Sequence, residues 1–129
     1  MEIKDFCTGI HHIGIPTNDI EETIQFYECL GFHVILATRN NDVTVAFLQL
    51  HNLILETYEN KSATLQSGAI DHIAIDVKDI DELFKLIKSK NFHLLNHGVQ
   101  FLPFWEKGVK FFTILGPNKE KVEFCEKLS

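Results

Sequence analysis

The chain has 129 residues, 45% of them hydrophobic and 23% charged, which is enough for one compact domain with a sizeable core. The net charge is −6, and the lysines and the single arginine, Arg39, are scattered without a basic stripe, which argues against nucleic-acid binding. No apolar run approaches the roughly 20 residues of a membrane span, and the N-terminus lacks the pattern of a signal peptide, so we expect a cytoplasmic protein with no membrane partner.

The first half of the chain predicts one strand, one helix and three further strands, over about residues 8–59. Residues 10–15 alternate β-branched and other side chains, as in a strand. Asp19 is the predicted N-cap of a helix whose apolar residues recur at a spacing of three to four as far as Gly31, the predicted C′ residue. Strands are then predicted at about residues 32–39, 43–50 and 52–58, with a turn at residues 40–42.

The second half repeats this order, after a polar linker at about residues 60–68. GIHHIGIPTNDIEE (residues 9–22) and AIDHIAIDVKDIDE (residues 69–82) are identical at about half their positions, and His12 and His72 are 60 residues apart (72 − 12). This second module, about residues 69–128, predicts a strand at 70–77 and a helix from the N-cap Asp79 to about Lys90. Strands follow at about 92–96, 109–115 and 121–126, with a turn at 117–119.

Two modules of the order β-α-β-β-β predict an α+β fold, with curved mixed sheets and both modules in one domain that spans residues 1–129. A four-stranded sheet with a single helix has one uncovered face. We therefore expect the other module, or a second chain, to cover the concave face of each sheet.

Each module places one histidine and one glutamate on that face. Strand alternation directs Ile13 and Ile15 to the helix side and leaves His12 on the other, and the repeat gives His72 the same direction. The last strand of each module carries one acid within an apolar stretch, Glu56 and Glu123. A carboxylate in such a stretch is costly to bury unless it is paired or bound to a metal.

We interpret these four residues as the ligands of one divalent metal ion in a cleft formed by the sheets. Two imidazoles and two carboxylates suit Ni, Zn, Co, Mn or Fe(II), and they leave room for water or substrate. The alternative is that each histidine is hydrogen-bonded structurally and each glutamate is solvated. The matching places in the two modules favour the metal. The other histidines have no repeat partner and are expected to be structural or at the surface: His11, His33, His51, His93 and His97.

The three cysteines, Cys7, Cys29 and Cys125, are far apart and have no CxxC spacing. An odd, widely spaced set predicts neither a disulfide framework nor a thiolate metal site. We expect free thiols that act as small buried hydrophobic residues.

At these residues the sequence resembles the vicinal oxygen chelate superfamily, which includes glyoxalase I, bleomycin-resistance proteins, methylmalonyl-CoA epimerase and extradiol dioxygenases. IHHIGIPTNDIEETIQFYECLGF resembles the opening strand and helix of that superfamily, and GPNKEKVEF resembles its closing turn and strand. The resemblance covers essentially the whole chain. The order His, Glu, His, Glu is most similar to glyoxalase I, or lactoylglutathione lyase.

The resemblance implies an isomerising lyase. A small-molecule substrate with two adjacent oxygens would chelate the ion, and Glu123 would be the catalytic base that removes a proton beside a carbonyl. In glyoxalase I the substrate is the hemithioacetal of methylglyoxal and glutathione. That enzyme commonly holds the glutathione carboxylates with arginines, one of them in the first strand, whereas this chain has Ile-Gly-Ile-Pro at residues 13–16.

Three further residues are predicted to border the substrate. Phe104 and Trp105 lie in the apolar stretch of residues 100–106, which either walls a pocket, folds onto the core or forms a dimer contact. Asn60 could take the place of a missing arginine.

Two other functions remain open from the sequence: an epimerase of the methylmalonyl-CoA type on the same metal, and a non-enzymatic protein that binds a small molecule or an antibiotic. Short members of the family are commonly dimers, so we expect a homodimer. The site forms either within one chain or across two.

Overall fold

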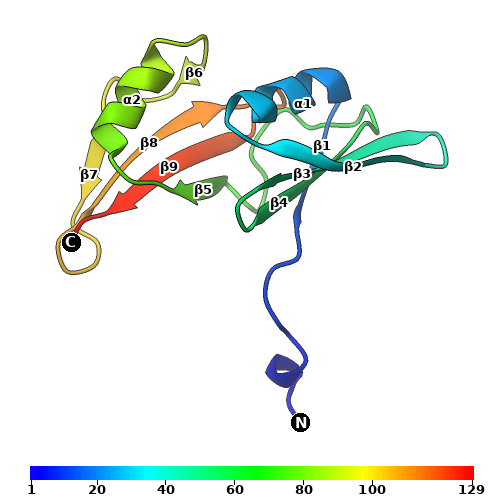
Figure 1. Ribbon diagram of the computed structural model, residues 1–129, viewed down its shortest axis with the longest axis horizontal. Coiled ribbons are helices and arrows are strands. Elements are labelled where there is room, and N and C mark those ends of the chain that lie inside the picture. The colour runs from blue at the N-terminus through cyan, green and yellow to red at the C-terminus, as the bar shows by residue number, and fades with distance from the viewer. The chain divides into compact units, whose positions relative to one another are not determined.

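The computed structural model describes all 129 residues, which form two compact units, Met1–Ala63 and Thr64–Ser129. The boundary between the units lies within the predicted linker. In each unit a helix packs against a mixed sheet that stays open at its edges (Figure 1). The predicted α+β fold with two mixed sheets is therefore confirmed.

Unit 1 follows the predicted order of elements and adds a short 3₁₀ helix near the N-terminus. Its sheet has the order β1-β4-β3-β2, in which β1 runs parallel to β4 and the other pairs are antiparallel. Both hairpins turn through two residues, and the first residue of each turn, Asn41 or His51, has a positive φ (58° and 51°). The elements are η1 (Ile3–Asp5), β1 (Ile13–Pro16), α1 (Ile20–Cys29), β2 (His33–Asn40), β3 (Val43–Leu50) and β4 (Leu53–Tyr58).

The alternation of β4 separates the core of unit 1 from its site. Helix α1 packs on β2, β3 and β4, and Tyr27 of the helix and Leu48 and Leu55 of the sheet are almost completely buried. Glu56 follows Leu55 and therefore points to the opposite face of the sheet. We call this face, in each unit, the open face.

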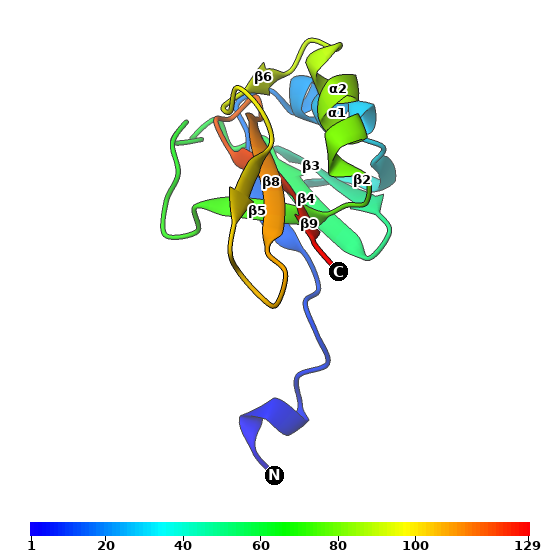
Figure 2. The same cartoon turned by 90° about the vertical axis from the view of Figure 1, so that its left-hand side faces the viewer.

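Unit 2 has the same order of elements, but two short strands form the outer edge of its sheet. Its sheet has the order β5-β9-β8-β6, with β5 parallel to β9, and α2 packs on β8 and β9 (Figure 2). The elements are β5 (His72–Asp76), α2 (Ile80–Lys88), β6 (His93–Leu94), β7 (Gln100–Leu102), β8 (Val109–Leu115) and β9 (Lys121–Lys127).

The predicted edge strand at residues 92–96 is wrong in extent, because two short strands replace it. Strands β6 and β7 pair with opposite ends of β8. Between them, the Thr113 main chain accepts a hydrogen bond from Leu95 N and donates one to the Asn96 side chain, at 2.9 and 2.8 Å. The Asn96 side chain takes the place of a main-chain partner for Thr113. The backbone can therefore separate from β8 after β6 and pair with β8 again as β7.

The two predicted helix caps turn out differently. Asp19 is an N-cap whose carboxylate accepts from Glu22 N. Asp79 occupies the N-cap position but is left-handed (φ 53°) and makes no side-chain cap bond, so this prediction is only partly right. In both units a distant glutamate accepts a hydrogen bond from the first helical N–H, at 3.0 Å in each case: Glu59, directly after β4, from Ile20 N, and Glu126, within β9, from Ile80 N.

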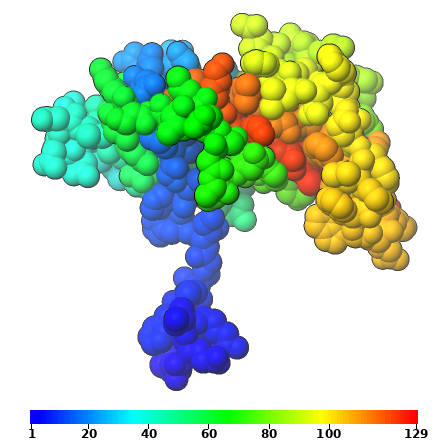
Figure 3. Space-filling model, turned by 180° about the vertical axis from the view of Figure 1, so that it is seen from behind, coloured from blue at the N-terminus to red at the C-terminus, as the bar shows by residue number.

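The cysteines are free thiols, but the prediction that they are buried is wrong. Cys7 is exposed because residues 1–10 bury no side chain and extend away from the body of unit 1 (Figure 3). Cys29 is exposed at the end of α1, and only Cys125 is partly covered. Burial, followed by the negative charges of Glu123 and Asp76, raises the pKa of Cys125. No helix of the structure is long and apolar enough to cross a membrane.

Candidate metal-binding site

One strand register builds the same His–Glu pair in each unit. In the parallel pair β1–β4, Glu56 lies opposite Gly14, and in the parallel pair β5–β9, Glu123 lies opposite Ala74. Gly14 and Ala74 each follow a predicted histidine by two residues. The predicted first strand is too long, since β1 begins at Ile13 and His12 directly precedes it.

The pair in unit 1 is close enough for direct interaction. His12 Nε2 lies 3.3 Å from Glu56 Oε1, and both side chains are about one-third exposed or less. The His12 ring meets Phe47 edge-on, with a centroid distance of 5.5 Å. On the other side of the ring, His12 Nδ1 lies 2.8 Å from His11 Nδ1. His11, which the sequence predicts to be structural or at the surface, thus contacts a predicted ligand.

The histidine and the glutamate of unit 2 are farther apart, and a charged residue contacts the histidine from its other side. His72 Nε2 lies 3.8 Å from Glu123 Oε1. His72 Nδ1 lies 2.9 Å from Asp71 Oδ2, and Lys121 Nζ lies 3.1 Å from the other oxygen of the same carboxylate. Hydrogen bonds from His72 and then from Lys121 hold the pKa of Asp71 below its ordinary value.

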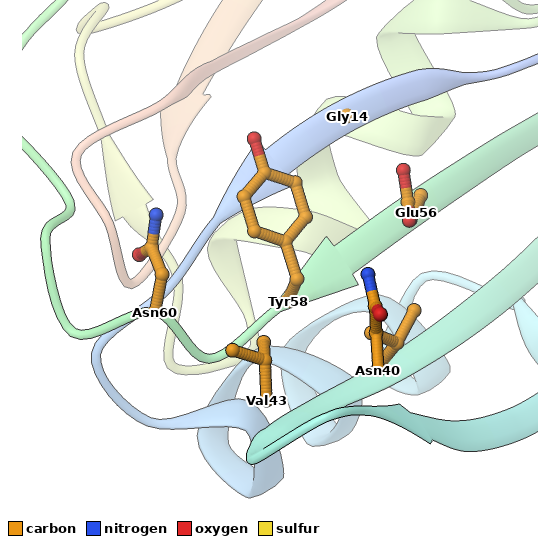
Figure 4. Close-up of a pocket in the computed structure, with 7 residues that line it drawn as sticks. Gly14, Asn40, Val43, Glu56, Tyr58 and Asn60 are labelled. Atoms are coloured by element: carbon orange, nitrogen blue, oxygen red, sulfur yellow. The ribbon is translucent and has the colours of Figure 1, made fainter.

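A cavity of about 420 Å³ adjoins Glu56 in unit 1 (Figure 4). The Tyr58 and Asn40 side chains point into it beside the Glu56 carboxylate. A Cβ atom on Gly14 would make ordinary van der Waals contact with the Tyr58 ring, at 3.5 Å. The complete lining is Gly14, Asn40, Val43, Val45, Glu56, Tyr58 and Asn60.

The sequence predicted Glu56 and Asn60 in this site but missed Tyr58 and Asn40. Tyr58 follows Glu56 by two residues in the same strand, so strand alternation alone would have placed both on the open face. Asn40 was missed because the sequence prediction put it in the turn at residues 40–42, whereas it is the last residue of β2 and pairs with Val43 across a two-residue turn.

In unit 2 a cavity of about 210 Å³ contains His72 and Glu123 together. Asp71 and Lys121 line it as well, so the charged support of the histidine is part of its wall. The remaining lining residues are Leu95, Asn96 and Thr113.

Phe104 and Trp105 line neither of these two cavities. They lie in the loop between β7 and β8, exposed by 53% and 62%, and Lys127 Nζ is 5.7 Å from the centre of the Trp105 ring. Their role as a pocket wall stays a prediction.

The donor atoms of each unit fit a divalent ion in chemistry and spacing. Two donors at about 2.1 Å from one ion lie roughly 3.0–3.4 Å apart at octahedral or tetrahedral angles. The His12–Glu56 distance of 3.3 Å lies in this range, and the His72–Glu123 distance of 3.8 Å needs a closer approach by a few tenths of an ångström. No group of three or more His, Cys, Asp or Glu side chains is gathered for a metal, so each unit offers half of the predicted ligand set.

Comparison with known proteins identifies the family. The sequence profile of the Glyoxalase/Bleomycin resistance protein/Dioxygenase superfamily matches residues 9–102. The chain belongs to this superfamily. Across 125 residues it is 29% identical to Uncharacterized protein YwbC of Bacillus subtilis (strain 168), covering 92% of this chain and 97% of that protein.

Solved structures of the superfamily share the fold. A glyoxalase family protein from Enterococcus faecalis matches with a TM-score of 0.78 and 22% identity, over 94% of this chain and 99% of that one. A glyoxalase family protein from Bacillus cereus matches with a TM-score of 0.74 and 15% identity over the full length of both chains. These glyoxalase-superfamily structures agree with the α+β architecture, and identities this low support the fold alone.

Proposed function

We propose that this member of the glyoxalase superfamily is a metal-dependent lyase or isomerase of the glyoxalase I type. One divalent ion is held by His12 and Glu56 from one unit and by His72 and Glu123 from the other. The observation that carries the proposal is the repeated register, which sets a histidine beside a glutamate on the open face of both sheets.

The chain's own residues supply the proton transfer. Glu123, whose side chain is 19% exposed, is the base that takes a proton from the carbon bearing the hydroxyl and sulfur of a hemithioacetal. It returns that proton to the neighbouring carbon while the hydroxyl proton passes to the adjacent carbonyl oxygen, so the substrate is isomerised and no oxidant or reductant is needed. A bound divalent ion would supply Lewis-acid stabilisation of the negative charge that develops on the substrate oxygens.

The unit 1 cavity favours an uncharged group in the substrate. Its lining holds amides, a phenol and one carboxylate, but no lysine or arginine. The guanidinium of Arg39 donates to Thr44 Oγ1 and Asp42 O at the hairpin turn, at 3.4 and 3.1 Å. A glutathione carboxylate would therefore find no cationic partner in this cavity. The lack of a partner for glutathione favours a second candidate, an epimerase that uses the same base and the same ion on a substrate without glutathione.

A substrate panel tests the proposal. Protein reconstituted separately with each candidate metal is assayed with methylglyoxal plus glutathione, with methylglyoxal plus a small neutral thiol, and with an acyl-CoA thioester that has an acidic α-proton. We expect metal-dependent conversion of a hemithioacetal, with the neutral thiol accepted at least as well as glutathione. Turnover of the thioester alone would replace the lyase by the epimerase, and turnover of neither would remove both.

We further propose that the working form is a homodimer, and that the two His–Glu pairs of one site come from one chain or from two. Mixing His12→Ala chains with His72→Ala chains separates the two arrangements. If each site is shared between chains, one of the two sites in the mixed dimer has all four ligands and regains metal binding. If each site lies within one chain, every site still lacks one histidine and none is regained.

A further inference from the structure

The two histidines of the proposed ligand set are held by different chemistry. In unit 2, Lys121 Nζ, Asp71 and His72 form a continuous chain of charge-assisted contacts, with distances of 3.1 Å to one Asp71 oxygen and 2.9 Å to the other. The strand register explains these contacts, because His72 lies opposite Lys121 in the β5–β9 pair and Asp71 directly precedes β5. The carboxylate thus has a partner for each oxygen.

The Asp71 contact determines which nitrogen of His72 carries its proton. An ionised carboxylate only accepts hydrogen bonds, so the nitrogen beside it, Nδ1, has to be the donor. In a neutral imidazole the other nitrogen, Nε2, then carries a free lone pair, and this atom faces Glu123 at 3.8 Å. Two acceptors that face each other are satisfied by a shared cation.

Unit 1 has no equivalent support. The residue before His12 is His11, and their Nδ1 atoms are 2.8 Å apart, so either neutral ring can be the donor. Ile54 precedes Glu56 by two residues, where Lys121 precedes Glu123 by two. The Lys–Asp–His contacts of unit 2 therefore have no counterpart at the matching place in unit 1, although the His–Glu pair itself is repeated.

We propose that Asp71 is a positioning residue that fixes His72 with its proton on Nδ1 and its Nε2 free, which makes His72 the stronger histidine ligand of the site. The ligand half of this statement rests on the proposed function. A carboxylate behind a ligating imidazole fixes the ring and increases its donor strength, and its loss typically lowers metal affinity by about 10–100-fold. His12 lacks such a partner and contributes less.

The positioning role is measured without any metal. In metal-free protein with ¹⁵N-labelled histidine, NMR reports the protonated nitrogen of each ring at about pH 8.5, where an ordinary imidazole is neutral. We expect His72 to carry its proton on Nδ1 in the wild type and to shift towards the Nε2–H form in Asp71→Ala. Asp71→Glu should restore the wild-type signature at least in part. Asp76→Ala removes another carboxylate of β5 and should leave the His72 signals unchanged.

A wild-type His72 with its proton on Nε2, or an unchanged signature in Asp71→Ala, would overturn the positioning role. A metal titration then tests the ligand half, with Zn²⁺ alone as the probe. We expect Asp71→Ala to weaken Zn²⁺ binding about 10–100-fold, and His11→Ala to weaken it less. An equal or greater loss in His11→Ala contradicts the ranking of the two histidines. Failure of the wild type to bind Zn²⁺ would remove the ranking and count against the proposed function, while the NMR result still decides what Asp71 does.

Discussion

Replacing Glu123 by Gln is expected to reduce turnover of the hemithioacetal by about 10²–10⁴-fold, the usual contribution of a general base. Glutamine keeps the volume of the side chain but cannot take a proton from carbon. The fold should survive, because Glu123 lies on the open face between the buried Val122 and Phe124, which stay in place. Turnover per bound metal ion, with the metal measured in the same sample, is the quantity to compare.

Glu56→Gln is the matched control, because Glu56 occupies the same register position in unit 1. We expect this variant to lose metal affinity while keeping most of its turnover per bound ion. If Glu123→Gln retained wild-type turnover at full metal occupancy, Glu123 would not be the base. If Glu56→Gln were the slower variant, the roles of the two carboxylates would have to be exchanged.

Phe112→Ala is expected to lower the free energy of unfolding of unit 2 by about 3–5 kcal/mol, the usual loss for a large aromatic side chain removed from a core. Phe112 is completely buried on β8, and its ring lies 5.1 Å from the ring of Phe84 on α2 and 5.1 Å from that of Phe124 on β9. It therefore joins the helix to the strand that carries Glu123. Urea denaturation followed by circular dichroism measures the change.

Phe104→Ala makes the same chemical change at an exposed site in the same unit. We expect it to alter stability by no more than about 0.5 kcal/mol, as surface substitutions usually do. Equal effects of the two substitutions would mean that Phe112 is not a central core residue, and the arrangement of α2 on the sheet would need revision.

Much of the fold follows from two patterns in the sequence. The recurrence of GIHHIGIPTNDIEE as AIDHIAIDVKDIDE shows that one supersecondary unit occurs twice, and alternation within each copy predicts the strands. Strands β3 and β8 match their predicted residues at both ends. Both are central strands with buried residues along their length, so their hydrophobic pattern is complete.

The errors lie where long-range pairing determines the structure. Residues 10–12 alternate like a strand, but β1 has hydrogen-bonded partners on β4 only from Ile13 onward. The left-handed conformation of Asp79 cannot be read from a sequence that repeats Asp19, since the cap of α2 comes from the distant Glu126. The division of the outer strand of unit 2 depends on the Asn96 side chain bonding to the main chain of Thr113.

The same distinction applies to the candidate site. Alternation places His12, Glu56, His72 and Glu123 on the open faces, and the structure brings the members of each pair together within its unit. Asp71 was missed, although it directly precedes His72, because its contact with the ring depends on a side-chain rotamer. Lys121 was missed because only the β5–β9 register brings it to Asp71.

The central claim is that the two His–Glu pairs hold one divalent ion, and its most direct test is the metal content of the purified protein. Elemental analysis should find about one transition-metal ion per chain in the wild type, a clear loss in His72→Ala, and retention in His33→Ala, which alters an exposed residue of β2 outside both pairs. A wild type that carries no metal, and takes up none when offered Ni, Zn, Co, Mn or Fe(II), would contradict the claim and indicate a protein that binds its small molecule without a metal.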